Sequence, residues 1–227
     1  MNRLLLCTLL LASSAAAAAA PQSTGALRDI DKVNGHISAD AGQAYGDLGT
    51  VNGGISLAQG ASARDVGTVN GGIEAGQGVH ARDVSTVNGG IRFGRQARID
   101  GDIETVNGGI FSDRDSQVRG NISTVNGGIG LVGTEVGGRI DTVNGDITVG
   151  ADSRVAGGIK VSKPQGGLAN LFGSPKVPRV VIGPNAVVDG ELVFERSVKL
   201  FVHASARIGP VRGAVAQRYE GNAPPRD

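Results

Sequence analysis

A six-residue string, Thr-Val-Asn-Gly-Gly-Ile, recurs along the chain at nearly constant spacing. Five copies are complete, and looser copies occupy 32–37 and 142–147. Steps of 18, 18, 18, 19, 19 and 18 residues separate the asparagines of these copies, Asn34, Asn52, Asn70, Asn88, Asn107, Asn126 and Asn144. A fixed short period is typical of proteins built from stacked repeats.

The residue types of each copy favour strands over helices. Gly-Gly in every copy costs a helix about 1 kcal/mol per glycine relative to alanine, and β-branched residues dominate the remainder. Three short strands of about six residues would fill one coil, and coils would stack about 4.8 Å apart through parallel hydrogen bonds. We therefore predict an all-β, single-stranded parallel β-solenoid of about ten coils with an 18–19-residue repeat.

We expect five parts along the chain, because the repeat loosens after its seventh copy. They are a signal peptide at 1–20, a solenoid with seven Val-Asn-Gly repeats at 21–162, a Pro/Gly-rich loop at 163–178, C-terminal coils at 179–215 and a flexible tail at 216–227. Leu168, Leu171 and Phe172 make the loop partly apolar. They would either cover the coils or contact a partner.

The first twenty residues resemble a cleaved export signal. A short positive region at Asn2 and Arg3 precedes the apolar stretch 4–11, and small residues at 13–20 suit signal cleavage. The apolar stretch is shorter than the roughly 20 residues of a membrane span. Cys7, the only cysteine, lies inside it. We thus expect a periplasmic or secreted protein with no disulfide and no stable membrane span after cleavage.

Three aliphatic positions recur in every copy. They are the Val before each Asn, the Ile three residues after it and the aliphatic residue four before it. We predict that all three columns stack inside the solenoid as a continuous dry core. The Asn and Thr columns are expected on the surface, with the Asn amides bonded to one another as a ladder.

An acidic column lies five residues before the asparagines, at Asp29, Asp47, Asp65, Asp83 and Asp102. Carboxylates stacked at about 4.8 Å repel one another. Either each caps a turn amide in solvent, with Arg28, Arg64 and Arg82 placed to neutralise some of them, or the column binds cations such as calcium. Capping is the preferred interpretation, and both remain open here.

No motif of catalysis, cofactor binding or metal binding is found in the sequence. His36, His80 and His203 are far apart, and neither a nucleophile elbow nor a P-loop occurs. The best enzyme candidates are Asp100, Asp102 and Glu104, or Asp113 and Asp115, and each is interpreted as a turn residue. We expect no catalytic, cofactor-binding or metal-binding residues and no cofactor.

Two stretches, 149–159 and 182–192, combine Val-x-Gly-x-Ile-type units with a nearby Gly-x-x-Ala or similar turn. They resemble bactofilins, bacterial β-helix proteins that form polymers. The Val-Asn-Gly-Gly-Ile copies are similar to the repeats of an adhesin-type family of exported β-solenoids. Together the resemblances cover most of residues 26–213 and imply a structural or adhesive role.

We expect a non-enzymatic structural, polymer-forming or adhesin-like protein of the bacterial cell envelope. The alternative is a periplasmic carbohydrate-binding or carbohydrate-active solenoid, for which aromatic platforms are scarce: Tyr45, Tyr219, Phe93 and Phe111 are the candidates. Expected partners are further copies at the solenoid ends, an envelope protein or a glycan. Nucleic acid is not expected, since 22 basic residues nearly balance 21 acidic ones.

Overall fold

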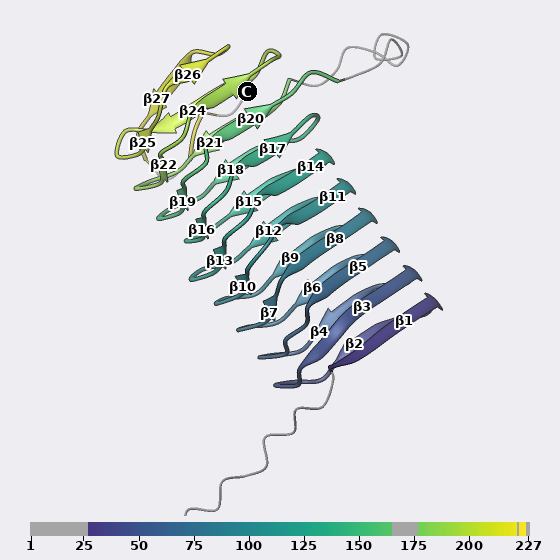
Figure 1. Ribbon diagram of the computed structural model, residues 1–227. Helices are drawn as coiled ribbons and strands as arrows, with labels where there is room; N and C mark the ends of the chain where they lie inside the picture. Colours follow the sequence, from purple (N-terminus) through teal and green to yellow (C-terminus); the bar gives the residue numbers. More distant parts are fainter. Residues whose placement is uncertain (1–26, 165–176, 222, 226–227) are drawn as a thin grey trace, which may run out of the picture.

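The described chain forms an elongated stack of coils (Figure 1). The computed structural model describes residues 27–164, 177–221 and 223–225. Within these residues every regular element is a strand, and every strand pair is parallel. The predicted all-β parallel β-solenoid of about ten coils with a repeat of about 18 residues is confirmed.

Three sheets run along the stack: each coil contributes one strand to the first sheet and one to the second, and seven coils also contribute a strand to the third. The first sheet contains, in order, β1 (Arg28–Asn34), β3 (Tyr45–Asn52), β5 (Asp65–Asn70), β8 (Asp83–Asn88), β11 (Ile103–Asn107), β14 (Ile122–Asn126), β17 (Ile140–Thr142), β20 (Ile159–Val161), β23 (Leu192–Phe194) and β26 (Val211–Arg212). The second sheet contains β2 (Ile37–Ala39), β4 (Ile55–Leu57), β6 (Ile73–Ala75), β9 (Ile91–Phe93), β12 (Ile110–Ser112), β15 (Ile129–Leu131), β18 (Ile147–Val149), β21 (Arg179–Ile182), β24 (Lys199–His203) and β27 (Ala216–Tyr219). The third, shorter sheet contains β7 (His80–Ala81), β10 (Arg98–Ile99), β13 (Gln117–Val118), β16 (Glu135–Val136), β19 (Arg154–Val155), β22 (Val187–Val188) and β25 (Arg207–Ile208).

Two of the three predicted core columns lie inside the stack. The Ile column of the second sheet pairs in register and is at most 2% exposed from Ile37 to Ile147. The aliphatic column of the first sheet is buried from Leu48 to Ile140, and only Ile30, in the first coil, is half-buried. Aliphatic side chains thus stack coil upon coil and form one continuous core.

The prediction that the Val column is buried and the Thr column exposed was wrong. The Val side chains from Val33 to Val125 are 39–68% exposed, whereas the threonines from Thr50 to Thr142 are 2–5% exposed. Side chains alternate along a strand, so residues four and two before each Asn share the inner face and the Val points outward. The Thr50, Thr68, Thr86, Thr105 and Thr124 hydroxyls donate to glycine carbonyls of the preceding coil at 2.8 to 3.2 Å.

One left-handed residue recurs in the turn between the second and third sheets. Glycine fills the position in four coils, Gly42, Gly60, Gly78 and Gly133. In four further coils a residue other than glycine adopts a φ of 56 to 62°, at Gln96, Asp115, Asp152 and Asn185. The enzyme candidate Asp115 is therefore one of the residues that turn the chain, as residue types tolerant of this region do.

The solenoid extends further toward the C-terminus than expected and includes part of the predicted tail. Strand β27 pairs with β24, and Tyr219 is 7% exposed, so the tail predicted from residue 216 onward was wrong for residues 216–219. Tyr219, Phe201 and Val181 form a small apolar cluster separate from the main core. The guanidinium of Arg179 lies 4.6 Å from the Phe201 ring centroid and donates to the carbonyl of Pro225 at 2.6 Å.

The expected loop at 163–178 falls mostly at 165–176, outside the described residues, together with Leu168, Leu171 and Phe172. On either side of it the stack continues without a shift. Strand β20 precedes the segment and β21 follows it, and β21 pairs with β18 of the preceding coil through Ile147 and Val180. The segment is therefore an insertion at the corner between the first and second sheets.

Candidate functional site

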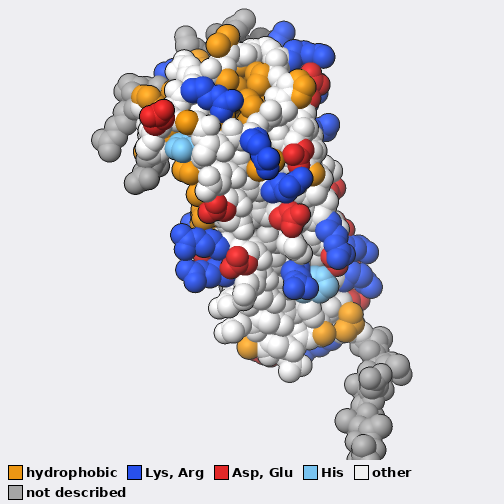
Figure 2. Space-filling model, turned by 90° about the vertical axis from the view of Figure 1, so that its left-hand side faces the viewer, with side chains coloured by type: hydrophobic (Ala, Val, Ile, Leu, Met, Phe, Trp, Pro, Cys, Tyr) orange, Lys and Arg blue, Asp and Glu red, His pale blue; other side chains and the backbone are white. Residues whose placement is uncertain are grey.

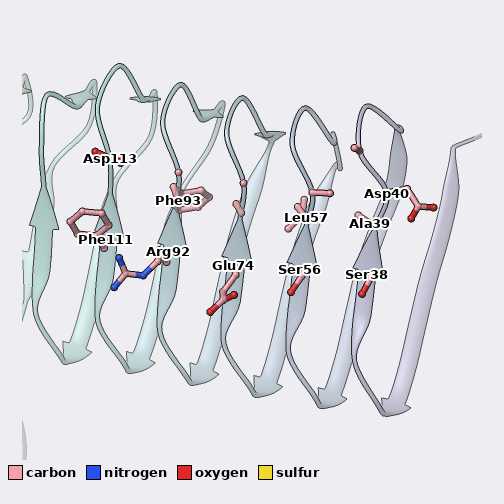
Figure 3. Close-up of a pocket in the computed structure, with 15 residues that line it drawn as sticks. Ser38, Ala39, Asp40, Ser56, Leu57, Glu74, Arg92, Phe93, Phe111 and Asp113 are labelled. Carbon is pink, nitrogen blue, oxygen red and sulfur yellow. The ribbon is translucent and has the colours of Figure 1, made fainter.

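A hollow crosses the outer surface of the second sheet over the first five coils (Figure 3). Each coil contributes one outward side chain from the strand that follows its Gly-Gly corner. We call these five side chains the groove row: Ser38, Ser56, Glu74, Arg92 and Phe111. The hollow has a volume of about 640 Å³ on the turn side of the row. A second, of about 580 Å³, lies on the side of the glycine corner.

The groove row combines hydroxyl, charged and aromatic groups. The Arg92 guanidinium lies 4.8 Å from the centroid of the Phe111 ring, a cation–π distance. Asp40 and Asp113 stand at the turn edge of the hollow (Figure 3). Hydroxyls, a carboxylate and a guanidinium beside a ring can bind a ligand rich in hydroxyl groups.

Of the predicted aromatic platforms, only Phe111 reaches this surface. Phe93, expected to be exposed, is 1% exposed because it follows Ile91 by two residues and shares its inward face, so that prediction was wrong. Tyr45 is buried, and its hydroxyl accepts the amide N–H of Asp40 at 3.0 Å. The groove row was not predicted, although the variable residue after each Ile of the repeat is its signal in the sequence.

The acidic column lies along the edge of the first sheet, and three members cap amides as expected. The Asp29, Asp83 and Asp102 carboxylates accept the backbone N–H of the corresponding residue one coil later, at 2.6 to 2.9 Å. Asp47 binds the Arg64 guanidinium through two hydrogen bonds, which foremost hold the pKa of its carboxyl below the usual value. Asp65 pairs with Arg82. The described residues include no group of three or more His, Cys, Asp or Glu placed to hold a metal ion.

The other enzyme candidates do not converge. Asp100 binds His80 at 2.7 Å and Arg119 at 2.6 Å, and the His80 hydrogen bond foremost lowers the pKa of the Asp100 carboxyl. Asp113 accepts the amide of Arg114 at 2.8 Å. Glu104 lies on the outer face of the first sheet, between Ser85 and Ser123. These carboxylates are spread over a sheet face and several turns rather than paired about one pocket.

The remaining histidines also lie apart. His36 is exposed in the first coil, and its carbonyl accepts the Lys32 ammonium at 2.6 Å. His203, near the other end, accepts or donates a 2.8 Å hydrogen bond with the Ser205 hydroxyl and meets the Tyr219 ring edge-on at 5.2 Å.

On the side drawn in Figure 2, basic and acidic side chains lie interspersed along the stack. In the described part of the chain, no helix has the length and apolar character needed to cross a membrane.

The chain matches no family model, no curated protein and no solved structure.

Proposed function

We propose that this chain is an exported, non-enzymatic solenoid with a structural, polymer-forming or adhesin-like role in the bacterial cell envelope. One observation carries the proposal: the first coil presents an open strand edge. β1 ends its sheet, and six of its seven residues are exposed. An unpaired edge is a template for another chain. The resemblance to polymer-forming bactofilins and the export signal expected at 1–20 agree with this role.

Some backbone donors of the first coil face away from the rest of the stack, whereas the amides of Gly35 and Ile37 donate to the second coil. In the third sheet, the Ser62, His80 and Arg98 amides each donate to a carbonyl of the preceding coil at 2.8 to 3.1 Å. Ala44 bridges Ser62 and occupies this position in the first coil, where none of the described residues offers its amide an acceptor. A second copy stacked on this end would supply the missing acceptors.

Lys32 places a charged side chain at the same end of the stack. It occupies the inward position that later coils fill with buried threonine, and it is exposed. Charged residues on edge strands restrict indiscriminate pairing. Stacking at this end therefore requires a partner surface with room for the Lys32 amine, which favours a defined contact over general aggregation.

An Ala44→Pro variant is expected to weaken end-to-end assembly several-fold while the fold persists. Proline removes the outward donor, and its ring occupies the space that a partner strand would approach. Ala44 is exposed, so few internal contacts change. Sedimentation velocity and electron microscopy of parent and variant would measure the change.

Deleting residues 220–227 is the control, because it leaves β27 intact at the opposite end. It should not reduce assembly. A parent that stays monomeric at every concentration, or assembly lost only on deleting this segment, would contradict the proposed role of the first coil.

The groove row supports a second candidate function, carbohydrate binding. Phe111 offers a ring face, and Ser38, Ser56 and Glu74 offer hydrogen-bonding groups at a spacing of one coil, about 4.8 Å, which is close to one sugar unit of a β-linked chain. Five coils would thus accommodate a short linear glycan.

Affinity electrophoresis with the β-1,4-linked tetramer of N-acetylglucosamine would test this function. We expect Phe111→Ala to weaken retardation about tenfold, equivalent to about 1.4 kcal/mol. Gln117→Ala, on the third sheet, should have no effect. If the tetramer leaves the mobility of the protein unchanged, or if maltotetraose changes the mobility equally, the protein has no specific site for this glycan class.

A further inference from the structure

The outer face of the first sheet is built from four parallel columns. Across each strand the order is the acidic column, a small-residue column, the exposed Val column and the Asn ladder. The small-residue column is Gly49, Gly67 and Ser85 on β3, β5 and β8, paired in register. Beside it the Val column is about 40% exposed at Val51, Val69 and Val87. Exposed valines aligned over many coils form an apolar stripe that water does not favour.

A depression runs along the small-residue column. It has a volume of about 390 Å³ and a floor of Gly49, Gly67 and Ser85, with carboxylates of the acidic column at its edge. The Asp31 carboxylate of the preceding coil lies over Gly49, so the furrow is open at Gly67 and Ser85. A ridge of valines therefore lies next to a furrow with the same repeat along the stack. A partner that fills this furrow must present side chains at the spacing of one coil, about 4.8 Å.

The Asn ladder forms the opposite border of the face. Each amide from Asn52 to Asn144 donates one N–H to the carbonyl oxygen of the preceding Asn at 2.9 to 3.0 Å. A carboxamide nitrogen carries two N–H groups, so one per Asn remains to donate outward. Across the face, Asp47 pairs with Arg64, and Asp65 and Asp83 pair with Arg82. An ionised carboxylate has about four acceptor sites, so the exposed oxygens of these pairs can accept a further N–H.

The order of these columns makes the face complementary to itself. A half-turn about an axis parallel to the stack reverses the columns but keeps the coils level. The Val column of each copy then lies over the furrow of the other, and the donors of each Asn ladder approach the acidic column opposite. Closed dimers use such isologous contacts, and matched columns of paired sheets form dry interfaces.

We propose that two copies of this chain pair side by side, in parallel, through the outer face of the first sheet. Contact is closest over β5 and β8, because the Asp31 carboxylate lies over Gly49 on β3 and Glu104 replaces the small residue in the coil after β8. Two valines on each side, Val69 and Val87, bury little area compared with a permanent dimer, so the pair is weak and reversible. This pairing does not depend on end-to-end stacking, since it uses a different surface.

Site-directed crosslinking tests the predicted geometry. In a chain with Cys7→Ser, single Gly67→Cys and Val69→Cys variants are prepared and then mixed under mild oxidation. Position 69 of one copy faces position 67 of the other, so the mixture should form a disulfide-linked dimer, and each variant alone should form several-fold less. Two results would overturn the proposal. One is a higher yield of crosslinked dimer from Val69→Cys alone than from the mixture. The other is no crosslinked dimer in any sample.

A second test, which needs no cysteine, introduces a charged side chain into the column of exposed valines. Val69→Asp should weaken dimerisation at least tenfold in sedimentation equilibrium, because it places a carboxylate in the furrow of the partner. Thr148→Asp, exposed on the second sheet, is the matched control and should dimerise like the parent. A dimer that survives Val69→Asp, or a parent with no dimer at any concentration, would refute the proposal, whereas loss of end stacking in Ala44→Pro leaves this dimer intact.

Discussion

An Ile91→Asp variant is expected to lose most of its folding stability, by about 4 kcal/mol or more. Ile91 is 1% exposed and pairs with Ile73 and Ile110 of the neighbouring coils. The carboxylate would lie between two apolar coils without an ionic partner. Because each coil contacts mainly its neighbours, the defect should divide the stack into two weaker segments.

Thermal unfolding followed by circular dichroism would measure this loss. Thr148→Asp is the control, since it introduces the same side chain at an outward position of the second sheet and should shift the melting temperature little. Equal melting temperatures for the two variants would contradict the burial of the Ile column. Hydrogen exchange should further show protection lost first in β9 and the strands paired with it, β6 and β12.

A Gly89→Ala variant should be destabilised by about 3 kcal/mol or more, whereas Gly90→Ala should cost less than about 1 kcal/mol. A Cβ on Gly89 would overlap the backbone carbonyl of Gly71 in the preceding coil, and backbone cannot move aside as a side chain can. A Cβ on Gly90 would lie 3.3 Å from the carbonyl oxygen of Gly109, a tight contact that a small shift relieves.

The repeat itself agrees with this difference. The second glycine of the pair is replaced by His36 in the first copy and by Asp146 in the seventh, while the first glycine is present in all seven. Urea unfolding of the adjacent Ala variants would compare them directly. A Gly89→Ala variant as stable as Gly90→Ala would show that the coils can separate locally at little cost.

The sequence predicted the stack, the Ile column and the Asn ladder because identical residues at a fixed period must lie over one another. It misplaced Val69 and Thr68, since spacing from the Asn defines a column but does not state which face that column occupies. Strand alternation from buried Val66 would have resolved both. The groove row was missed for a different reason: Glu74, Arg92 and Phe111 vary between coils, and a search for repetition overlooks what does not repeat.

The in-register continuation of the stack across 165–176 has a consequence for protein engineering. Strand pairing from β18 to β21 fixes the neighbouring coils, while the corner between β20 and β21 accommodates a long additional segment. Exposed loop tips are sites at which proteins tolerate insertions. This corner is therefore a suitable site for inserting an unrelated peptide, which would occupy a defined position along the stack. Peptides inserted at the corresponding corners of other coils would be spaced in steps of one coil.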